Sequence, residues 1–253
     1  MFSVTERAAI RNRVIDMGRA DTRITGGAIT GSYALDAEDE WSDVDMAFGY
    51  DADNQPEEIL RDWTAELAHQ ADIVHYFDLR RGETLYRVFL LSNALEVDIS
   101  LTPAAAFGAH GPSFRLLFGR SVEGASTASE SQDELTGWGW IYLLSARAAI
   151  ARGRLWQAVR LVGALRDHGL ALACVRQGVP SAYAKGVHKL RDDATEPWRE
   201  SLVRSVEEDE LQRALGVAAQ AFLREVALSD GALADRLAGP LFEAGLPTSA
   251  ATD

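Results

Sequence analysis

Two pairs of acidic residues have the types and spacing that could bind a metal ion. Asp43 and Asp45 are separated by one residue in the stretch DVDMAFGY. Glu96 and Asp98 have the same spacing in the stretch LEVDISLT. Both stretches alternate polar and apolar residues as half-buried strands do, so each acidic pair shares one face of its strand. If the two strands are neighbours in a sheet, up to four carboxylates converge on one region.

Such a concentration of negative charge is unfavourable unless a cation binds there. Carboxylates held close together repel one another. Hard divalent cations such as Mg²⁺ prefer oxygen ligands, and carboxylates are prominent among them. The sequence therefore predicts a metal site in which Asp43 and Asp45 hold the ion.

A Gly-Ser pair ahead of Asp43 supplies a second part of such a site. Gly31 and Ser32 follow the strand-like stretch ITGGAIT. Glycine allows a close approach to the backbone, and backbone N–H groups with a hydroxyl at a helix start can hold phosphate oxygens. Mg²⁺ that is held by few carboxylates keeps positions open for water and for substrate phosphates. We therefore predict that the turn holds phosphates that the metal bridges.

The chain has only two lysines, and both lie in one short segment. Among 25 lysines and arginines, only Lys185 and Lys189 are lysines, in the stretch AYAKGVHKL. A lysine ammonium is a compact point charge that suits a phosphate group. We expect Lys185 to contact a triphosphate, with Lys189 as second candidate and Tyr183 as a hydrogen-bonding or ring contact to the nucleotide. The alternative is that Lys185 is an ordinary exposed lysine at a helix end.

The elements that must position the acidic residues belong to a first domain, residues 1–125. The hydrophobic periodicity and turn signals predict an amphipathic helix at 3–20, strands at 24–30 and 43–50, a helix at 56–71, and strands at 72–79, 84–91 and 95–102. This order predicts an α+β domain in which a mixed β-sheet is flanked by helices.

The second domain, residues 126–253, is expected to be an all-α bundle. From about residue 132 onward, apolar residues recur every three or four positions. The polar stretch at 121–132 is the expected boundary. We expect Trp138, Trp140 and Trp156 to pack within the helical domain.

Composition restricts the partners. The net charge of −13 and the pI near 4.8 argue against nucleic acid and favour a cationic small molecule. The chain shows no signal sequence and no apolar stretch long enough to span a membrane, so a cytoplasmic location is expected. An acidic loop could attract a cationic acceptor, although such runs are usually only solvated. Its acids are Asp36, Glu38, Asp39 and Glu40.

The motif resembles that of a known superfamily. Gly31-Ser32, ten intervening residues, Asp43-Val44-Asp45 and a later strand carboxylate resemble the signature of the DNA polymerase β-type nucleotidyltransferases. The two-domain layout with a helical second half is similar to the aminoglycoside nucleotidyltransferases. Those enzymes transfer a nucleoside monophosphate from a nucleoside triphosphate to a hydroxyl group of the drug.

The resemblance implies a role for each candidate residue. Asp43 and Asp45 would ligate Mg²⁺, and Ser32 would contact the triphosphate of ATP or another nucleoside triphosphate. Asp98 would be the third carboxylate, which either completes the metal site or accepts the proton of the attacking hydroxyl. Glu96 is the reserve candidate for that base. Lys185 would be the lysine with which similar enzymes contact the triphosphate from their helical domain.

The predicted function is therefore a Mg²⁺-dependent transfer of a nucleoside monophosphate, with AMP from ATP as the first expectation, to a hydroxyl of a small cationic acceptor such as an aminoglycoside. One alternative keeps the reaction and changes the acceptor to a protein hydroxyl, as in the nucleotidyltransferase antitoxins, or to another small molecule such as a lincosamide. A further alternative is a catalytically inactive module that binds nucleotide for regulation.

Overall fold

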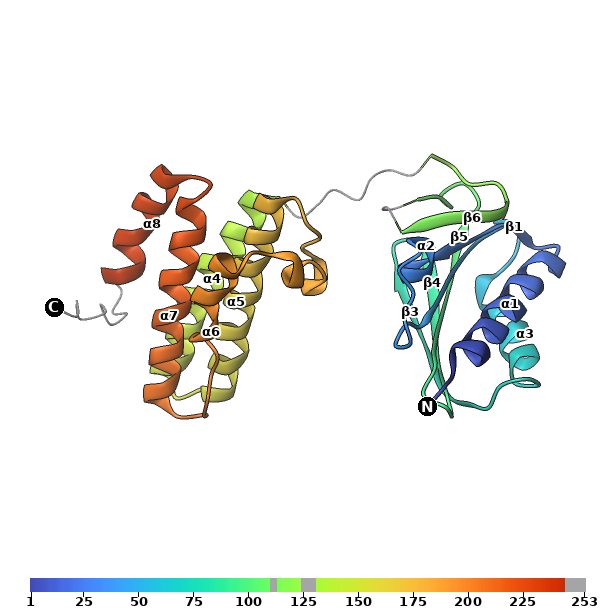
Figure 1. Ribbon diagram of the computed structural model, residues 1–253, viewed down its shortest axis with the longest axis horizontal. Helices are drawn as coiled ribbons and strands as arrows, with labels where there is room; N and C mark the ends of the chain where they lie inside the picture. The colour runs from blue at the N-terminus through green and yellow to red at the C-terminus, as the bar shows by residue number, and fades with distance from the viewer. Residues whose placement is uncertain (110–112, 124–130, 244–253) are drawn as a thin grey trace. The chain divides into compact units, whose positions relative to one another are not determined.

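The computed structural model describes residues 1–109, 113–123 and 131–243 (Figure 1). The chain divides into two compact units, Met1–Thr127 and Ala128–Asp253. The boundary expected at 121–132 falls largely on residues 124–130, which lie outside the described residues. Among the helices of the described residues, none is long and apolar enough to cross a membrane.

The first unit is built on a six-stranded mixed sheet. Its strands are β1 (Ile24–Thr30), β2 (Val44–Tyr50), β3 (Ile73–Arg81), β4 (Thr84–Leu91), β5 (Glu96–Pro103) and β6 (Phe114–Gly119). The strand order is β3-β4-β5-β2-β1-β6, and every neighbouring pair is antiparallel except β2 and β5, which are parallel. The two strands that carry the acidic pairs are therefore neighbours near the middle of the sheet.

Two helices, α1 (Val4–Ala20) and α3 (Pro56–Leu67), lie side by side against one face of this sheet (Figure 1). Alternate residues of the parallel strands point into the core that these helices cover: Val44, Met46, Val97 and Ile99, each at most 1% exposed. Because successive side chains of a strand point to opposite faces, the acidic residues between them fall on the other face.

The ends of the two helices follow from capping and burial. The Ser3 side chain caps α1, and the Glu6 carboxylate accepts a hydrogen bond in return from the Ser3 backbone, which is a capping box. In α3, Pro56 occupies the first turn. We expected α3 to extend to Ala71, but it ends at Leu67, the last residue with a buried side chain, because residues 68–70 are exposed and add no packing.

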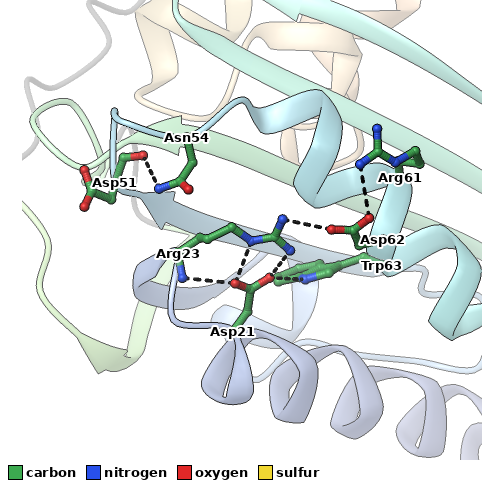
Figure 2. A network of polar contacts seen from close by, with 7 residues as sticks. All are labelled: Asp21, Arg23, Asp51, Asn54, Arg61, Asp62 and Trp63. Carbon is green, nitrogen blue, oxygen red and sulfur yellow. Dashed lines mark hydrogen bonds and ion pairs between the residues drawn. The ribbon is translucent and has the colours of Figure 1, made fainter.

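A polar network joins α1, β1 and α3 at one end of the unit (Figure 2). The Asp21 carboxylate accepts hydrogen bonds from the Arg23 guanidinium at 2.7 and 2.9 Å and from the Trp63 indole at 2.9 Å. Arg23 also donates to Asp62 of α3 at 2.9 Å. Burial raises the pKa of Asp21, but the hydrogen bonds from Arg23 and Trp63 outweigh it, so the pKa is lowered overall. The network fixes where the chain enters the sheet.

The second unit is helical. Its helices are α4 (Gln132–Ala151), α5 (Leu155–Gln177), α6 (Asp192–Arg199), α7 (Glu208–Ala227) and α8 (Gly231–Glu243). Two short 3₁₀ turns, Ala182–Ala184 and Val187–Lys189, lie between α5 and α6. The unit has its own core, in which residues such as Leu143, Leu165 and Phe222 are 0% exposed.

Two sequence expectations need correction. The sixth strand, β6, was not expected. The tryptophans predicted to pack in the helical unit are exposed instead: Trp138 by 45%, Trp140 by 37% and Trp156 by 77%. In α4 the buried positions include Leu135, Gly139 and Leu143, so the two tryptophans of this helix lie off its buried line.

Two glycines of α5 provide a matched test of packing in the second unit. A Cβ on Gly169 would lie 1.9 Å from the Trp198 ring of α6, whereas a Cβ on Gly163 would meet nothing nearer than 3.6 Å. Gly169→Ala should therefore lower the free energy of unfolding by about 1–3 kcal/mol through overpacking. Gly163→Ala should raise it by up to about 1 kcal/mol through helix propensity. Denaturant unfolding of both variants checks this, and equal effects would contradict the helix contact.

Candidate functional site

Asp45 and Asp98 lie directly opposite each other on the two parallel strands. Asp45 of β2 pairs in register with Asp98 of β5, between the buried pairs Val44–Val97 and Met46–Ile99. Both aspartates are partly exposed. The condition set by the sequence, that the two acidic strands be neighbours, is thus met, and these carboxylates share the sheet face that α1 and α3 leave free.

Gly31 brings the backbone of the Gly-Ser turn against Asp45. Its φ of +63° lies in the left-handed region, which favours glycine. A Cβ at this position would lie 1.9 Å from Asp45 Oδ2, so a side chain and the carboxylate could not occupy their places together. The approach of Asp45 therefore requires glycine here, and the predicted contact of this turn with phosphates stays a prediction.

Asp98 carries an unsatisfied buried atom. Its Oδ1 is buried and has no hydrogen-bond partner. Burial is the main cause that raises the pKa of Asp98 from 3.8 to about 6, and the charges of Glu96 and Asp43 raise it further. Arg81 at the end of β3 partly offsets these effects. A proton or a bound cation would therefore stabilise this carboxyl group.

The other two acids flank this pair. Asp43 lies one residue before β2, and its charge acts on Asp98, whereas Glu96 is exposed at the start of β5. Within the described residues, no three Asp, Glu, His or Cys side chains already form a group that could hold a metal. The donors themselves fit Mg²⁺, because Asp43, Asp45 and Asp98 offer only carboxylate oxygens and one of these is unpartnered.

Ser32 is the second residue of α2 (Gly31–Ala34), a helix of one turn. The N-cap position belongs to Thr30, which makes no side-chain capping bond. The commoner structural role that serine has at a helix start, N-capping, is therefore not the role of Ser32. Its proposed contact with a triphosphate stays a prediction.

The nucleotide candidates from the second half of the chain lie in the 3₁₀ segment. Lys185, Lys189 and Tyr183 are all exposed. Tyr183 and the next residue, Ala184, have φ values of +54° and +58°, which are uncommon for side chains of this kind. These residues belong to the second unit, so their role in a site with the acids stays a prediction.

The acidic loop is not a free anionic surface. Glu38 pairs with Arg7 and Arg11 at 3.0 and 2.5 Å, and Asp36 pairs with Arg115 at 2.9 Å. The possibility that these two acids attract a cationic acceptor is therefore weakened. Sequence reasoning did not single out these arginines or Arg81, because each is far in sequence from the residues that it contacts.

The raised pKa of Asp98 leads to a prediction about stability. A folded-state pKa of about 6 against an ordinary 3.8 means that the folded protein binds more protons than the unfolded chain between these values. The free energy of unfolding should then fall as the pH rises through this interval. In EDTA, Asp98→Asn should raise that free energy by on the order of 2 kcal/mol near pH 7.5 and leave it almost unchanged below about pH 4.

Denaturant unfolding of wild type and Asp98→Asn at both pH values checks this prediction. The exposed neighbour is the control, and Glu96→Gln should have a smaller effect. A variant that is less stable than the wild type near pH 7.5 would show that the Asp98 carboxylate makes a net favourable contact, contrary to the burial argument.

Comparisons with known proteins find similarity among solved structures, at low sequence identity. No protein-family model matches this chain, and no curated protein does. One similar solved structure is an aminoglycoside 6-adenyltransferase from Bacillus subtilis, with 13% identity and a TM-score of 0.41 over 96% of this chain and 99% of that chain. Another is a nucleotidyltransferase-like protein from Exiguobacterium sibiricum 255-15, with 13% identity and a TM-score of 0.40 over 88% and 76%.

Proposed function

We propose that this chain is a Mg²⁺-dependent nucleotidyltransferase that transfers AMP from ATP, or another nucleoside monophosphate from its triphosphate, to a hydroxyl group of a small acceptor. One observation carries the proposal. Asp45 and Asp98 lie opposite each other on neighbouring parallel strands, and the Gly31 backbone lies against Asp45. Burial and the charges of Glu96 and Asp43 disfavour the ionised form of Asp98, so a cation bound there would be stabilising, and the turn that would hold the phosphates lies beside Asp45.

The candidate residues of the first unit have separate roles in this reaction. Asp43, Asp45 and Asp98 would hold Mg²⁺, which when bound neutralises charge on the triphosphate. Gly31 and Ser32 would orient the phosphates through backbone N–H groups and the serine hydroxyl.

The transfer itself exchanges one bond of the α-phosphorus for another. The acceptor hydroxyl oxygen forms a bond to the α-phosphorus as the bond to pyrophosphate breaks, and the hydroxyl proton passes to a carboxylate. Asp98 would either complete the metal site or accept this proton, because its carboxylate lies opposite Asp45 and has a buried oxygen without a hydrogen-bond partner. Glu96 is the reserve candidate.

A cationic acceptor, with an aminoglycoside as the leading example, is favoured by the net charge of −13.

A second acceptor class is favoured by the surface beside Asp98. Phe77, Val88 and Asp98 lie opposite one another on successive strands, and Phe77 is 50% exposed. This apolar surface would suit a hydroxylated acceptor with an apolar part, such as a lincosamide or a protein side chain.

The experiment that tests the function measures pyrophosphate release with Mg²⁺ and each of the four ribonucleoside triphosphates. The acceptors are aminoglycosides, lincosamides and simple polyols. Asp43→Asn and Asp45→Asn should each lower acceptor-dependent release by at least about 100-fold, the scale of a lost electrostatic contact in a transition state. Both variants should keep the wild-type circular dichroism spectrum.

Asp53→Asn is the matched control, because it removes the same charge from an exposed aspartate of the same unit. It should keep wild-type activity. Wild-type rates in Asp43→Asn or Asp45→Asn would contradict the metal assignment. Binding of Mg²⁺ and ATP without turnover on any acceptor would instead favour the regulatory alternative.

A separate prediction concerns Lys185. If its ammonium contacts the triphosphate, Lys185→Ala should raise the KM for the nucleotide by about tenfold, the value of one hydrogen bond to a charged group. The KM for the acceptor should change much less. Steady-state kinetics with Arg199→Ala, an exposed cation of the same unit, as control checks this. An unchanged nucleotide KM in Lys185→Ala would exclude this role and turn attention to Lys189.

A further inference from the structure

The loop between α2 and β2 is held at its far end by a buried arginine of α1. Arg7 is only 1% exposed. Its Nη1 donates hydrogen bonds to the backbone oxygens of Asp39 at 2.5 Å and Ser42 at 2.9 Å. Its Nε lies 3.0 Å from Glu38 Oε1. One guanidinium therefore contacts three residues of the loop.

A second arginine of α1 holds the near end of the same loop. Arg11 is 8% exposed, and its Nη1 donates to the same Glu38 oxygen at 2.5 Å. Its guanidinium also lies 3.6 Å from the centre of the Tyr33 ring. Tyr33 directly follows Ser32. Arg7, Arg11 and Glu38, here called the arginine clamp, thus contact both ends of the segment between the Gly-Ser turn and Asp43.

The arginine clamp contacts a part of the chain that the sheet does not hold. β2 begins at Val44, so the backbone of Asp45 is held by the strands on either side. Asp43 lies outside this ladder. The residue before it, Ser42, is the one whose carbonyl oxygen Arg7 binds. This hydrogen bond restrains the residue directly before Asp43, together with the hydrogen bonds that join Ser42 to Asp39.

The chemistry of the clamp suits positioning more than stability. Burying two guanidiniums and a carboxylate has a large desolvation cost, and apolar side chains would stabilise a loop as well or better. A guanidinium, however, offers several N–H groups in a rigid plane, which fixes the direction of every carbonyl that it binds. Metal ligands require such support, because their affinity depends on the groups that orient them.

We propose that Arg7, together with Arg11 and Glu38, is a positioning residue that holds Asp43 and the Gly31-Ser32 turn in the arrangement that binds a divalent metal. The inference rests on the metal site of the proposed function. It adds that the α1 helix, far from the acids in sequence, determines the affinity of that site.

The test measures Mn²⁺ binding by electron paramagnetic resonance, since the signal of free Mn²⁺ reports affinity without turnover. The full chain is compared as wild type, Arg7→Lys, Asp43→Asn and Arg87→Lys. Arg7→Lys keeps the charge but loses the planar fork, and it should weaken Mn²⁺ binding by about tenfold. Hydrogen exchange of the segment 35–43 should become faster in the same variant.

Arg87→Lys is the matched control. Arg87 is 6% exposed, pairs with Asp78 through two hydrogen bonds and donates to Thr64 of α3, on the helix-covered side of the sheet. Its replacement should lower the melting temperature about as much as Arg7→Lys does, while Mn²⁺ affinity stays within about twofold of wild type.

The outcomes separate this inference from the proposed function. Equal Mn²⁺ affinity in Arg7→Lys and Arg87→Lys would overturn the positioning role and leave the metal site intact. Wild-type protein that binds no more Mn²⁺ than Asp43→Asn would overturn the metal site and the inference with it. If Arg7→Lys does not fold, Glu38→Gln replaces it. Weaker Mn²⁺ binding in that variant supports the proposal, and unchanged binding overturns it.

Discussion

The register of two neighbouring parallel strands, which sets Asp45 opposite Asp98, is the constraint on which the candidate site depends. Asp45 and Asp98 are held opposite each other because the residues on either side of them, on both strands, are buried in one core. Sliding one strand to separate the two carboxylates would remove those residues from the core. The sheet thus keeps Asp98 in a buried position that disfavours its ionised form, and one of its oxygens has no hydrogen-bond partner there.

Other parts of the first unit make room for Asp45 and hold the chain on either side of the two strands. Gly31 has no side chain where Asp45 needs room, and its positive φ turns the chain into α2 beside the acids. The polar network around Asp21 fixes the entry into β1 (Figure 2), and the arginine clamp fixes the loop into β2. Two polar contact sets therefore hold the chain at places where the sheet ladder does not reach.

Local patterns in the sequence predicted the elements well. β1 and β4 occupy the predicted residues, because alternation of apolar residues between turn signals is a strong local signal. β6 was missed, since its residues Phe114–Gly119 are mostly apolar and show no clear alternation. The outward position of Trp156 depends on which side of α5 is covered, and neighbouring helices decide that rather than the sequence of α5 itself.

The candidate site was only partly predictable, because part of its geometry depends on residues that are far apart in the sequence. The spacing of Asp43 and Asp45 is local, so their common strand could be inferred. That β2 and β5 are neighbours could be stated only as a condition, and the register that sets Asp45 opposite Asp98 is a property of the folded sheet. Arg7 contacts residues 32 and 35 positions away, and no spacing rule links a helix to a loop over that distance.

The most direct test of the central claim is calorimetric titration of the protein with a non-hydrolysable ATP analogue, with Mg²⁺ and then with EDTA. If the acids form a metal site beside a phosphate-binding turn, one analogue should bind per chain with Mg²⁺ present. Binding should be lost in EDTA and in Asp45→Asn. Equal binding with and without Mg²⁺, or in both proteins, would contradict the account, because the carboxylates would then have no part in holding the nucleotide.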